Sequence, residues 1–327
     1  MTLRHSLLAE PIAQFLAHHR ALGKRFDTEA ATLQLLERYL LEQQITALEA
    51  ITAALLEAFL STRPRASARS YNHLLNVLQR FFAWLERQGL LCPNPLHSRP
   101  RHASAQAVPF LFEPAQVEQL LRLAEALPDA RRTHRCGAAY RMSFALMYSL
   151  GLRVGEVARL CRADVDWERH CLAIRQTKFA KTRLVPVGPH LEAQLLQYLD
   201  AQGMTEPALP SDPLISLSHD HRQALSSHSI SRAFQRLLPQ LELTIPAGVA
   251  APRLHCLRHS FAVGTLLRWY RSGVDPAVRL SWLSTFLGHV NPTSTAVYLS
   301  ITEALLTEAS RRFERFAAPA LQEVHRP

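Results

Sequence analysis

The sequence lacks three features, and each absence argues against a class of protein. It contains no uninterrupted run of about 18 apolar residues, so no membrane-spanning helix is predicted. The five cysteines, at positions 92, 136, 161, 171 and 256, form no CxxC pair, and their odd number argues against a disulfide framework or a zinc finger. The N-terminal stretch reaches Glu10 and Pro11 before the core of a signal peptide could form. We therefore expect a cytoplasmic protein with reduced thiols and no membrane partner.

Lysine is almost absent as well. Of the 37 basic residues only Lys24, Lys178 and Lys181 are lysines, so 34 are arginines. Against 27 acidic residues this gives a net charge of +10, which points to nucleic acid as a partner. Arginine almost never releases a proton, whereas the pKa of a lysine can be tuned for proton transfer. The two lysines in TKFAKTR are therefore candidate proton donors.

The length and the hydrophobic pattern predict two domains. A chain of 327 residues, 48% of them hydrophobic, is long enough for two cores. Helical periodicity covers residues 8–90 and is clearest in YNHLLNVLQRFFAWLERQG, whereas two strand-like runs, CLAIRQT and TRLVPVG, occur among later helices. The predicted fold class is mainly α (α+β). It comprises a helical domain over 1–91, a basic Pro-rich linker over 92–113, and a larger helical domain with a small antiparallel sheet over 114–327.

Several arginines outside the larger domain are candidate DNA contacts. Arg63, Arg65 and Arg69 surround a proline just before a predicted helix, where they could contact phosphates or form a solvated turn. Arg99 and Arg101 lie in the linker, which suits a tether around a duplex and equally an ordinary exposed linker. We predict that all five contact DNA.

Four short motifs in the larger domain carry residues suited to phosphoryl transfer. They are Arg153 and Glu156 in GLRVGE, Lys178 in TKFAKTR, His255 and Arg258 in HCLRHSFA, and His289 and Tyr298 in LGHVNPTSTAVY. Two arginines can hold one phosphate and stabilise the charge of its transition state. Nearby cations favour the phenolate of a tyrosine, and a lysine or histidine can protonate a leaving oxygen. Together these residue types suffice for metal-free transfer through a phosphotyrosine.

The order and flanking residues of these motifs resemble the catalytic domain of the tyrosine recombinase (phage integrase) family over residues 140–305. TKFAKTRLVPV is similar to the family's GKGxKxRxVPL hairpin, with Thr177 and Phe179 in place of the two glycines, and HCLRHSFA to its HxLRH-S/T-FA box. The resemblance implies a catalytic set of Arg153, Lys178, His255, Arg258, His289 and the nucleophile Tyr298, supported by Glu156. Because both hairpin glycines are replaced, Lys181 is a second, less favoured candidate for the catalytic lysine besides Lys178. Lys181 and Arg183 are further predicted DNA contacts.

The resemblance implies a site-specific recombinase that cuts and rejoins DNA through a 3′-phosphotyrosine, with no cofactor and no metal. Residues 1–91 would be the family's helical core-binding domain. The expected partners are double-stranded DNA at specific sites and a homo-oligomer (a tetramer on paired sites) or a hetero-assembly with other recombinases. The expected location is the bacterial nucleoid. In the family the helix after the nucleophile often docks onto a neighbouring subunit, and residues 302–318 could do so or fold back on their own domain.

Three alternatives use similar residues. A nicking relaxase would need a metal site, for which His219-Asp220-His221 is the one close candidate and a poor one. A catalytically silent DNA-binding partner would have no need of the tyrosine. A type IB topoisomerase shares the chemistry but would act with little sequence preference.

Overall fold

The computed structural model describes residues 6–23, 26–65, 67–102, 107–129, 133, 135–175, 182–201, 209–218, 222–289, 291, 293–300, 307 and 310. Lys178, Lys181, the 219–221 segment and nearly all of the predicted C-terminal helix over 302–318 lie outside these residues. The chain divides into two compact units, Met1–Gln106 and Ala107–Pro327, and each is described by itself. Within the described ranges, no helix combines the length and the apolar character that crossing a membrane requires.

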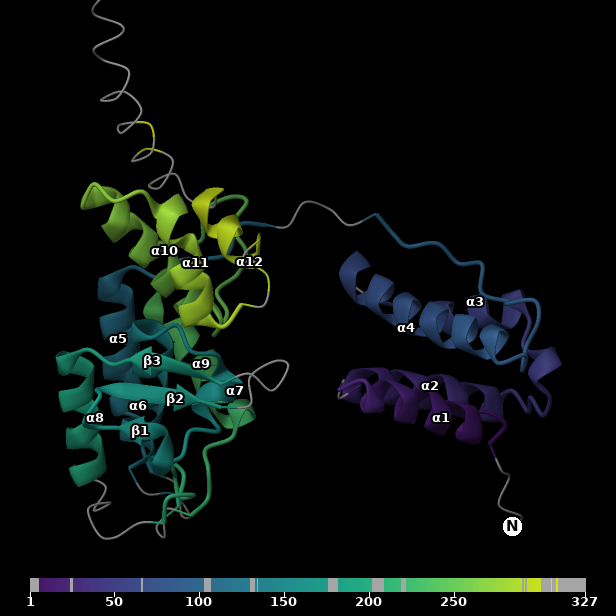
Figure 1. The fold of residues 1–327 in the computed structure, drawn as a ribbon, viewed down its shortest axis with the longest axis horizontal. Coiled ribbons are helices and arrows are strands. Elements are labelled where there is room, and N and C mark those ends of the chain that lie inside the picture. The colour runs from purple at the N-terminus through teal and green to yellow at the C-terminus, as the bar shows by residue number, and fades with distance from the viewer. Residues whose placement is uncertain are drawn as a thin grey trace, which may run out of the picture. The chain divides into compact units, whose positions relative to one another are not determined.

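The first unit is a set of helices around an apolar core (Figure 1). Its elements are α1 (Ala9–Ala21), α2 (Asp27–Glu42), the short 3-10 helix η1 (Leu48–Ala50), α3 (Ala53–Ser61) and α4 (Ala68–Arg87). The side chains of Thr52 and Ser67 cap α3 and α4 by accepting from backbone amides three residues on. Gly89 follows α4 with a φ of +70°, the left-handed backbone that commonly ends a helix. The apolar stripe of α4, including Leu78 and Phe81, is fully buried in this core.

The second unit is larger and mainly helical. Its elements are α5 (Pro114–Glu125), α6 (Cys136–Ser149), α7 (Val154–Val157), η2 (Arg162–Asp164), β1 (Val165–Asp166), β2 (Cys171–Ile174), β3 (Arg183–Pro186), α8 (Pro189–Ala201), α9 (Ser227–Leu237), η3 (Leu238–Leu241), α10 (Cys256–Arg271), α11 (Pro276–Leu287), α12 (Thr293–Ala296) and η4 (Val297–Ser300). The strands form an antiparallel sheet in the order β1-β2-β3, with Leu172 paired to Val165 and Val185. The predicted fold class is confirmed, while β1 is a strand that the sequence pattern did not indicate.

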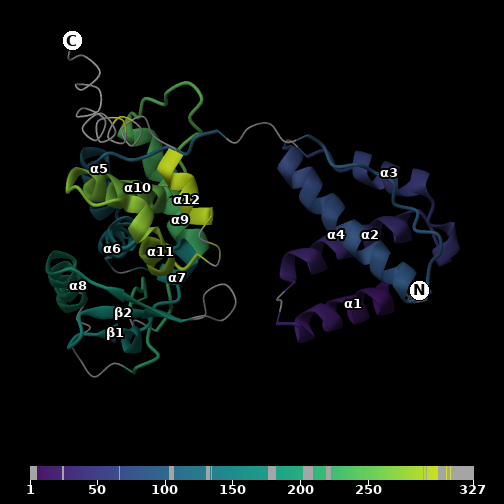
Figure 2. The same ribbon diagram turned by 45° about the horizontal axis from the view of Figure 1, so that its top comes forward.

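Two helices and a sheet edge position the functional side chains. Helix α10 packs against α6, α11 and η4, and α11 packs against β3. Figures 1 and 2 show α10, α11 and α12 close together at one end of this unit. A small apolar cluster of Leu266, Leu283, Leu287 and the ring of Tyr298 fills the space between α10, α11 and η4. Residues far apart in the sequence thereby share one site.

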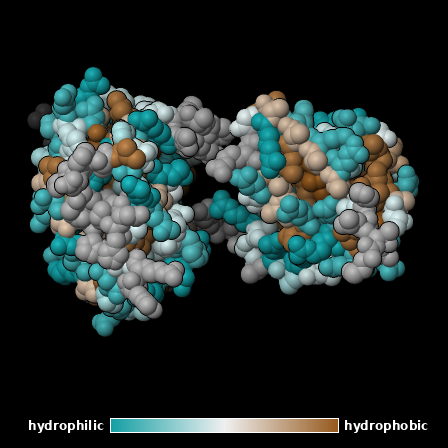
Figure 3. Space-filling view, turned by 90° about the horizontal axis from the view of Figure 1, so that it is seen from below, coloured by the Kyte–Doolittle hydropathy of each residue, from teal (hydrophilic) through white to brown (hydrophobic). Residues whose placement is uncertain are grey.

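Polar residues cover much of both units. In Figure 3 teal residues are spread over the visible face of each unit, with brown residues between them. Most large apolar side chains are buried, although Val278 and Trp282 on α11 are exposed. The described surface therefore has the mixed character that is usual for a folded protein.

Candidate active site

The described members of the predicted catalytic set come together around the end of α11. Arg153 directly precedes α7, His255 directly precedes α10, and Arg258 lies in the first turn of α10. His289 follows α11, and Tyr298 lies in η4. The contacts below join all five residues, although up to 145 positions separate them in the sequence.

Arg258 is the most deeply buried member. Its side chain has no exposed surface, and its guanidinium donates to the carbonyls of Gly151 (Nη1, 2.6 Å) and Leu287 (Nη2, 2.7 Å). Burial first, and then the charge of Arg153, lower the pKa of Arg258 to about 9. The group is therefore still a cation near neutral pH, and its two carbonyl bonds fix its orientation.

Two glycines beside these arginines have the backbone geometry that the site requires. Gly151 has a φ of +60°, and a Cβ there would lie 2.6 Å from the Phe261 ring. Gly288 has a φ of +66°, and its carbonyl accepts from Arg153 Nη2 at 3.0 Å. Left-handed backbone is accessible to glycine without strain. The GLR and LGH motifs thus contain Arg153 and His289 and also supply the backbone carbonyls that bind Arg153 and Arg258.

Glu156 is a buried carboxylate between two arginines. It accepts from Arg153 Nη1 at 2.7 Å and from both terminal nitrogens of Arg183, at 3.0 and 2.9 Å. Its Oε2 also accepts from the backbone amide of Arg153, the residue directly before α7. Burial alone would raise the pKa of Glu156, but hydrogen bonds and charges from the two arginines lower it to about 2. Glu156 is ionised at neutral pH and holds both guanidinium groups in place.

The structure gives Arg183 an internal position that differs from the predicted DNA contact. Its side chain is 9% exposed, and its Nε donates to the carbonyl of Phe286 at 2.7 Å while the other two nitrogens bind Glu156. All three nitrogens are therefore engaged within the protein. Arg183 links β3 to α7 and to the end of α11, a role that the sequence pattern did not indicate.

The hydroxyl of Tyr298 is hydrogen-bonded to a histidine that the sequence analysis did not single out. Tyr298 is 4% exposed, and its Oη lies 2.9 Å from Nδ1 of His259. His255, a member of the predicted catalytic set, packs against His259, with ring centroids 4.6 Å apart. His259 lies within the quoted HCLRHSFA motif and one helical turn after His255. A spacing of four residues puts two helical side chains on the same face, so the sequence already placed His259 beside His255.

His289 lies beside the ring of Tyr298. Its Nδ1 is 2.7 Å from the hydroxyl oxygen of Thr295, which is fully buried, and its ring is stacked with that of Tyr298 at 6.3 Å between centroids. Thr295 thus orients His289, and it is a second residue that the sequence analysis did not identify.

The electrostatics of the site favour an anion. Burial first, and then the charge of nearby arginines or histidines, lower the pKa of His255, His259 and His289 to about 4, so all three are neutral at pH 7. Burial raises the pKa of Tyr298, while the charges of Arg258 and Arg153 oppose that rise. Three guanidinium groups therefore face one carboxylate, Glu156, in the described part of the site. A phosphate would supply the missing negative charge.

The predicted DNA-contacting arginines of the first unit differ in exposure. Arg69, Arg99 and Arg101 are exposed, whereas Arg63 and Arg65 are half-buried. The guanidinium of Arg101 lies 3.9 Å from the centre of the Tyr71 ring, and that of Arg63 lies 5.0 Å from the Phe59 ring. Asn72 holds the backbone of Arg101 by two hydrogen bonds, of 2.8 and 2.7 Å. Arg101 therefore has a fixed position.

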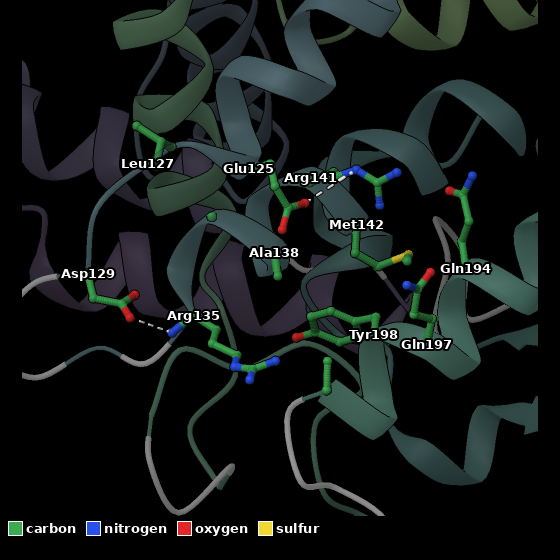
Figure 4. A pocket seen from close by; sticks show the side chains of 12 residues that line it. Glu125, Leu127, Asp129, Arg135, Ala138, Arg141, Met142, Gln194, Gln197 and Tyr198 are labelled. Carbon is green, nitrogen blue, oxygen red and sulfur yellow. Dashed lines mark hydrogen bonds and ion pairs between the residues drawn. The ribbon is translucent and has the colours of Figure 1, made fainter.

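A separate pocket of about 620 Å³ lies beside α5, α6 and α8 (Figure 4). Arg141 and Glu125 form an ion pair of 3.3 Å there, and the carboxylate of Asp129 accepts from the backbone amides of Arg135 and Cys136. These charges are paired within the protein, and the described lining includes no member of the predicted catalytic set. Among the described residues no group of three or more metal-ligating side chains occurs.

Comparisons with known proteins show the family to which the chain belongs. The profile of the "Phage integrase family" matches residues 111–304, and that of the "Phage integrase, N-terminal SAM-like domain" matches residues 30–89. The chain is 36% identical to the putative integrase/recombinase y4rB of Sinorhizobium fredii (strain NBRC 101917 / NGR234), over 74% of this chain and 76% of that protein. It is 31% identical to tyrosine recombinase XerC of Chromobacterium violaceum, over 89% of this chain and 90% of that protein. A crystal structure of a lambda integrase (75–356) dimer bound to a COC′ core site has the same fold, with a TM-score of 0.64 and 18% identity over 90% of this chain and 95% of that chain.

Proposed function

Because the chain belongs to the phage integrase family and is a tyrosine-type site-specific DNA recombinase, we propose that Tyr298 is its nucleophile. The observation that carries this proposal is the buried tyrosine, held at its hydroxyl by a histidine and flanked by two fixed arginines. In the reaction Tyr298 Oη attacks the scissile phosphorus, the bond to the 5′ oxygen breaks, and a 3′-phosphotyrosine forms. Attack by a 5′-hydroxyl on that linkage restores a DNA strand.

Arg153 and Arg258 hold the scissile phosphate, and His289 adds a hydrogen bond. Their neighbours support this assignment, since Glu156 orients Arg153 and the Gly151 and Leu287 carbonyls orient Arg258. Pre-oriented cations stabilise the added charge of the transition state without reorganising during the reaction. His255 belongs to the same cluster, since burial first, and then the neighbouring His259 and Arg258, lower its pKa.

Lys178 protonates the leaving 5′ oxygen, and Lys181 is the less favoured candidate for this role. Neither lysine is among the described residues, but both belong to the segment that joins β2 to β3. The Arg183–Glu156 ion pair ties β3, the strand that follows this segment in the sequence, to the arginine site, which supports the assignment. No metal or nucleotide takes part, because the phosphotyrosine conserves the energy of the broken bond.

The remaining assignments concern organisation and partners. Residues 1–91 form the DNA-binding core-binding domain, residues 92–113 the linker, and residues 114–327 the catalytic domain. Arg63, Arg65, Arg69, Arg99 and Arg101 contact phosphates of double-stranded DNA at specific sites. The active assembly is a tetramer on paired sites or a hetero-assembly with other recombinases, located at the nucleoid in the cytoplasm.

A covalent-trapping experiment tests the proposal. The protein is mixed with DNA flanking its own gene, in EDTA and without ATP, then denatured and screened for protein–DNA adducts, with Tyr298→Phe in parallel. The phenylalanine variant should bind DNA and form no adduct. Adducts that persist in this variant would show that another residue is the nucleophile. DNA binding without adducts by both proteins would favour a silent binding partner, and relaxation of any supercoiled DNA would favour a topoisomerase.

A further inference from the structure

The hydroxyl of Tyr298 is held in one direction by its surroundings. Its ring packs with Leu266, Leu283 and Leu287 between α10, α11 and η4, and it is 4% exposed. Because the ring cannot turn freely in this cluster, its oxygen stays within hydrogen-bond distance of Nδ1 of His259, at 2.9 Å. Packing of the ring therefore fixes the contact between Tyr298 and His259.

A phenol in this environment needs a proton acceptor when it attacks. An unperturbed tyrosine has a pKa of about 10, and burial raises the pKa of Tyr298 further despite the opposing charges of Arg258 and Arg153. The phenolate is therefore scarce at neutral pH before the reaction begins. An adjacent base that takes the proton during attack removes this obstacle.

His259 has the protonation state that a base requires. Burial and the charge of Arg258 keep its pKa at about 4, so the ring is neutral at pH 7 and one ring nitrogen carries a lone pair. The other titratable or charged groups around it are Tyr298 from η4, His255 and Arg258 from α10 and His289 after α11. Since a bound phosphate would offset the arginine charges, DNA binding should raise the basicity of His259.

We propose that His259 is the general base that accepts the phenol proton of Tyr298. The inference rests on the proposed function, in which Tyr298 is the nucleophile. As the bond from Tyr298 Oη to phosphorus forms, the phenol proton passes to Nδ1 of His259. The bond from phosphorus to the 5′ oxygen breaks, and that oxygen takes a proton from Lys178. During religation His259 returns its proton to the phenol oxygen.

The contact through Nδ1 defines the variant for the test. Asparagine places a polar atom near the position of Nδ1, so His259→Asn keeps a hydrogen-bond partner for the hydroxyl but cannot accept its proton. His255→Asn is the matched control one turn earlier on the same helix. Both are compared with the wild type in single-turnover cleavage of a DNA substrate that traps the covalent adduct, over a range of pH and with rates normalised to bound DNA.

We expect His259→Asn to slow cleavage by about 10²-fold or more. The wild-type rate should rise with pH until His259 is neutral and then level off, whereas the rate of His259→Asn should keep rising towards the pKa of the phenol. His255→Asn should slow cleavage and retain the wild-type pH dependence. Two results would overturn the inference. One is a cleavage rate of His259→Asn within about threefold of the wild-type rate. The other is that His255→Asn, and not His259→Asn, loses the decrease in cleavage rate at acidic pH.

Two additions keep the outcome interpretable. Replacing Tyr298 with a fluorotyrosine, whose phenol is more acidic, should accelerate His259→Asn more than the wild type, an effect that loss of structural support alone would not produce. If His259→Asn fails to fold, His259→Gln takes its place. Failure of the proposed function is recognised separately, because adducts would then persist in Tyr298→Phe.

Discussion

The two units of this protein are stabilised in different ways. In the described part of the first unit the buried residues are apolar except for Thr32, and its ion pair between Arg80 and Glu29 is long, at 4.0 Å, and partly exposed. The second unit buries Glu156 and Arg258 in the middle of its functional centre. Among the described residues, the interior of the first unit is therefore almost entirely apolar, whereas the interior of the second unit adds a polar network whose members need one another.

This difference shows how the active site affects stability. Buried charges lose hydration, and the arginines repel one another, since Arg153 and Arg183 both lower the pKa of Arg258 beyond the effect of burial. An apolar core of the same size would avoid both effects. The arrangement instead holds the guanidinium groups of Arg153 and Arg258 in fixed positions, and their proposed role at the phosphate would explain why the second unit keeps a less stable arrangement.

The largest effect should come from breaking the charge network at Glu156. Glu156→Ala leaves Arg183, which is 9% exposed, without its carboxylate, so we expect a loss of about 3–5 kcal/mol in the free energy of unfolding. Adduct formation should fall as well, because Arg153 loses its orienting partner. Chemical denaturation and the trapping assay measure the two effects.

The surface ion pair of the first unit provides the matched control. Glu29→Ala removes a carboxylate that pairs with Arg80 at 4.0 Å, where exposed pairs contribute about 0–1 kcal/mol. It should leave adduct formation unchanged. Equal losses of stability in the two variants would contradict the contrast between the units.

A smaller effect is expected from cavities in the two apolar cores. Leu78 in α4 and Leu120 in α5 are both fully buried, so truncation to alanine should lower the free energy of unfolding by about 3 kcal/mol in each case. Calorimetry should show Leu78→Ala lowering only the transition of the first unit and Leu120→Ala only that of the second. A single transition that moves in both variants would show that the units unfold together.

Much of the fold could be predicted from the sequence because its helices carry their own signals. The stripe in α4 has a strict helical period and Gly89 after it. Helix α11 carries equally clear signals that the sequence analysis passed over, namely a capping Asp275, Pro276 at the first turn and Gly288 at φ +66°. The two-residue strand β1 has no such pattern, because its pairing with β2 depends on tertiary contacts.

Motif order grouped Arg153, Arg258 and Tyr298, and the structure brings these residues together, while their roles stay predictions. No local pattern indicates that Arg183 reaches Glu156 across 27 positions. The choice between His255 and His259 also depends on which side of α10 faces η4, which the sequence alone does not determine. Long-range packing therefore decided the details that local periodicity could not.

The smallest expected effect is a pH dependence of stability that only the second unit should show. The pKa of His259 is about 4 in the folded protein, by burial first and then by the charge of Arg258, against about 6.5 in an unfolded chain. The folded state thus binds fewer protons between pH 6.5 and 4, so its stability is full above pH 6.5 and falls as the pH decreases towards 4. Because solvent screens part of this effect, we expect the free energy of unfolding to fall by about 1 kcal/mol through His259 between pH 7 and 5, or Tm to fall by about 3 °C.

Calorimetry of the wild type and His259→Asn at both pH values measures the difference, which should be smaller in the variant. A wild-type transition of the second unit that stayed constant or rose on acidification would mean that the histidines beside Tyr298 are not held neutral, and the polar site would then resemble the apolar unit in its response to pH.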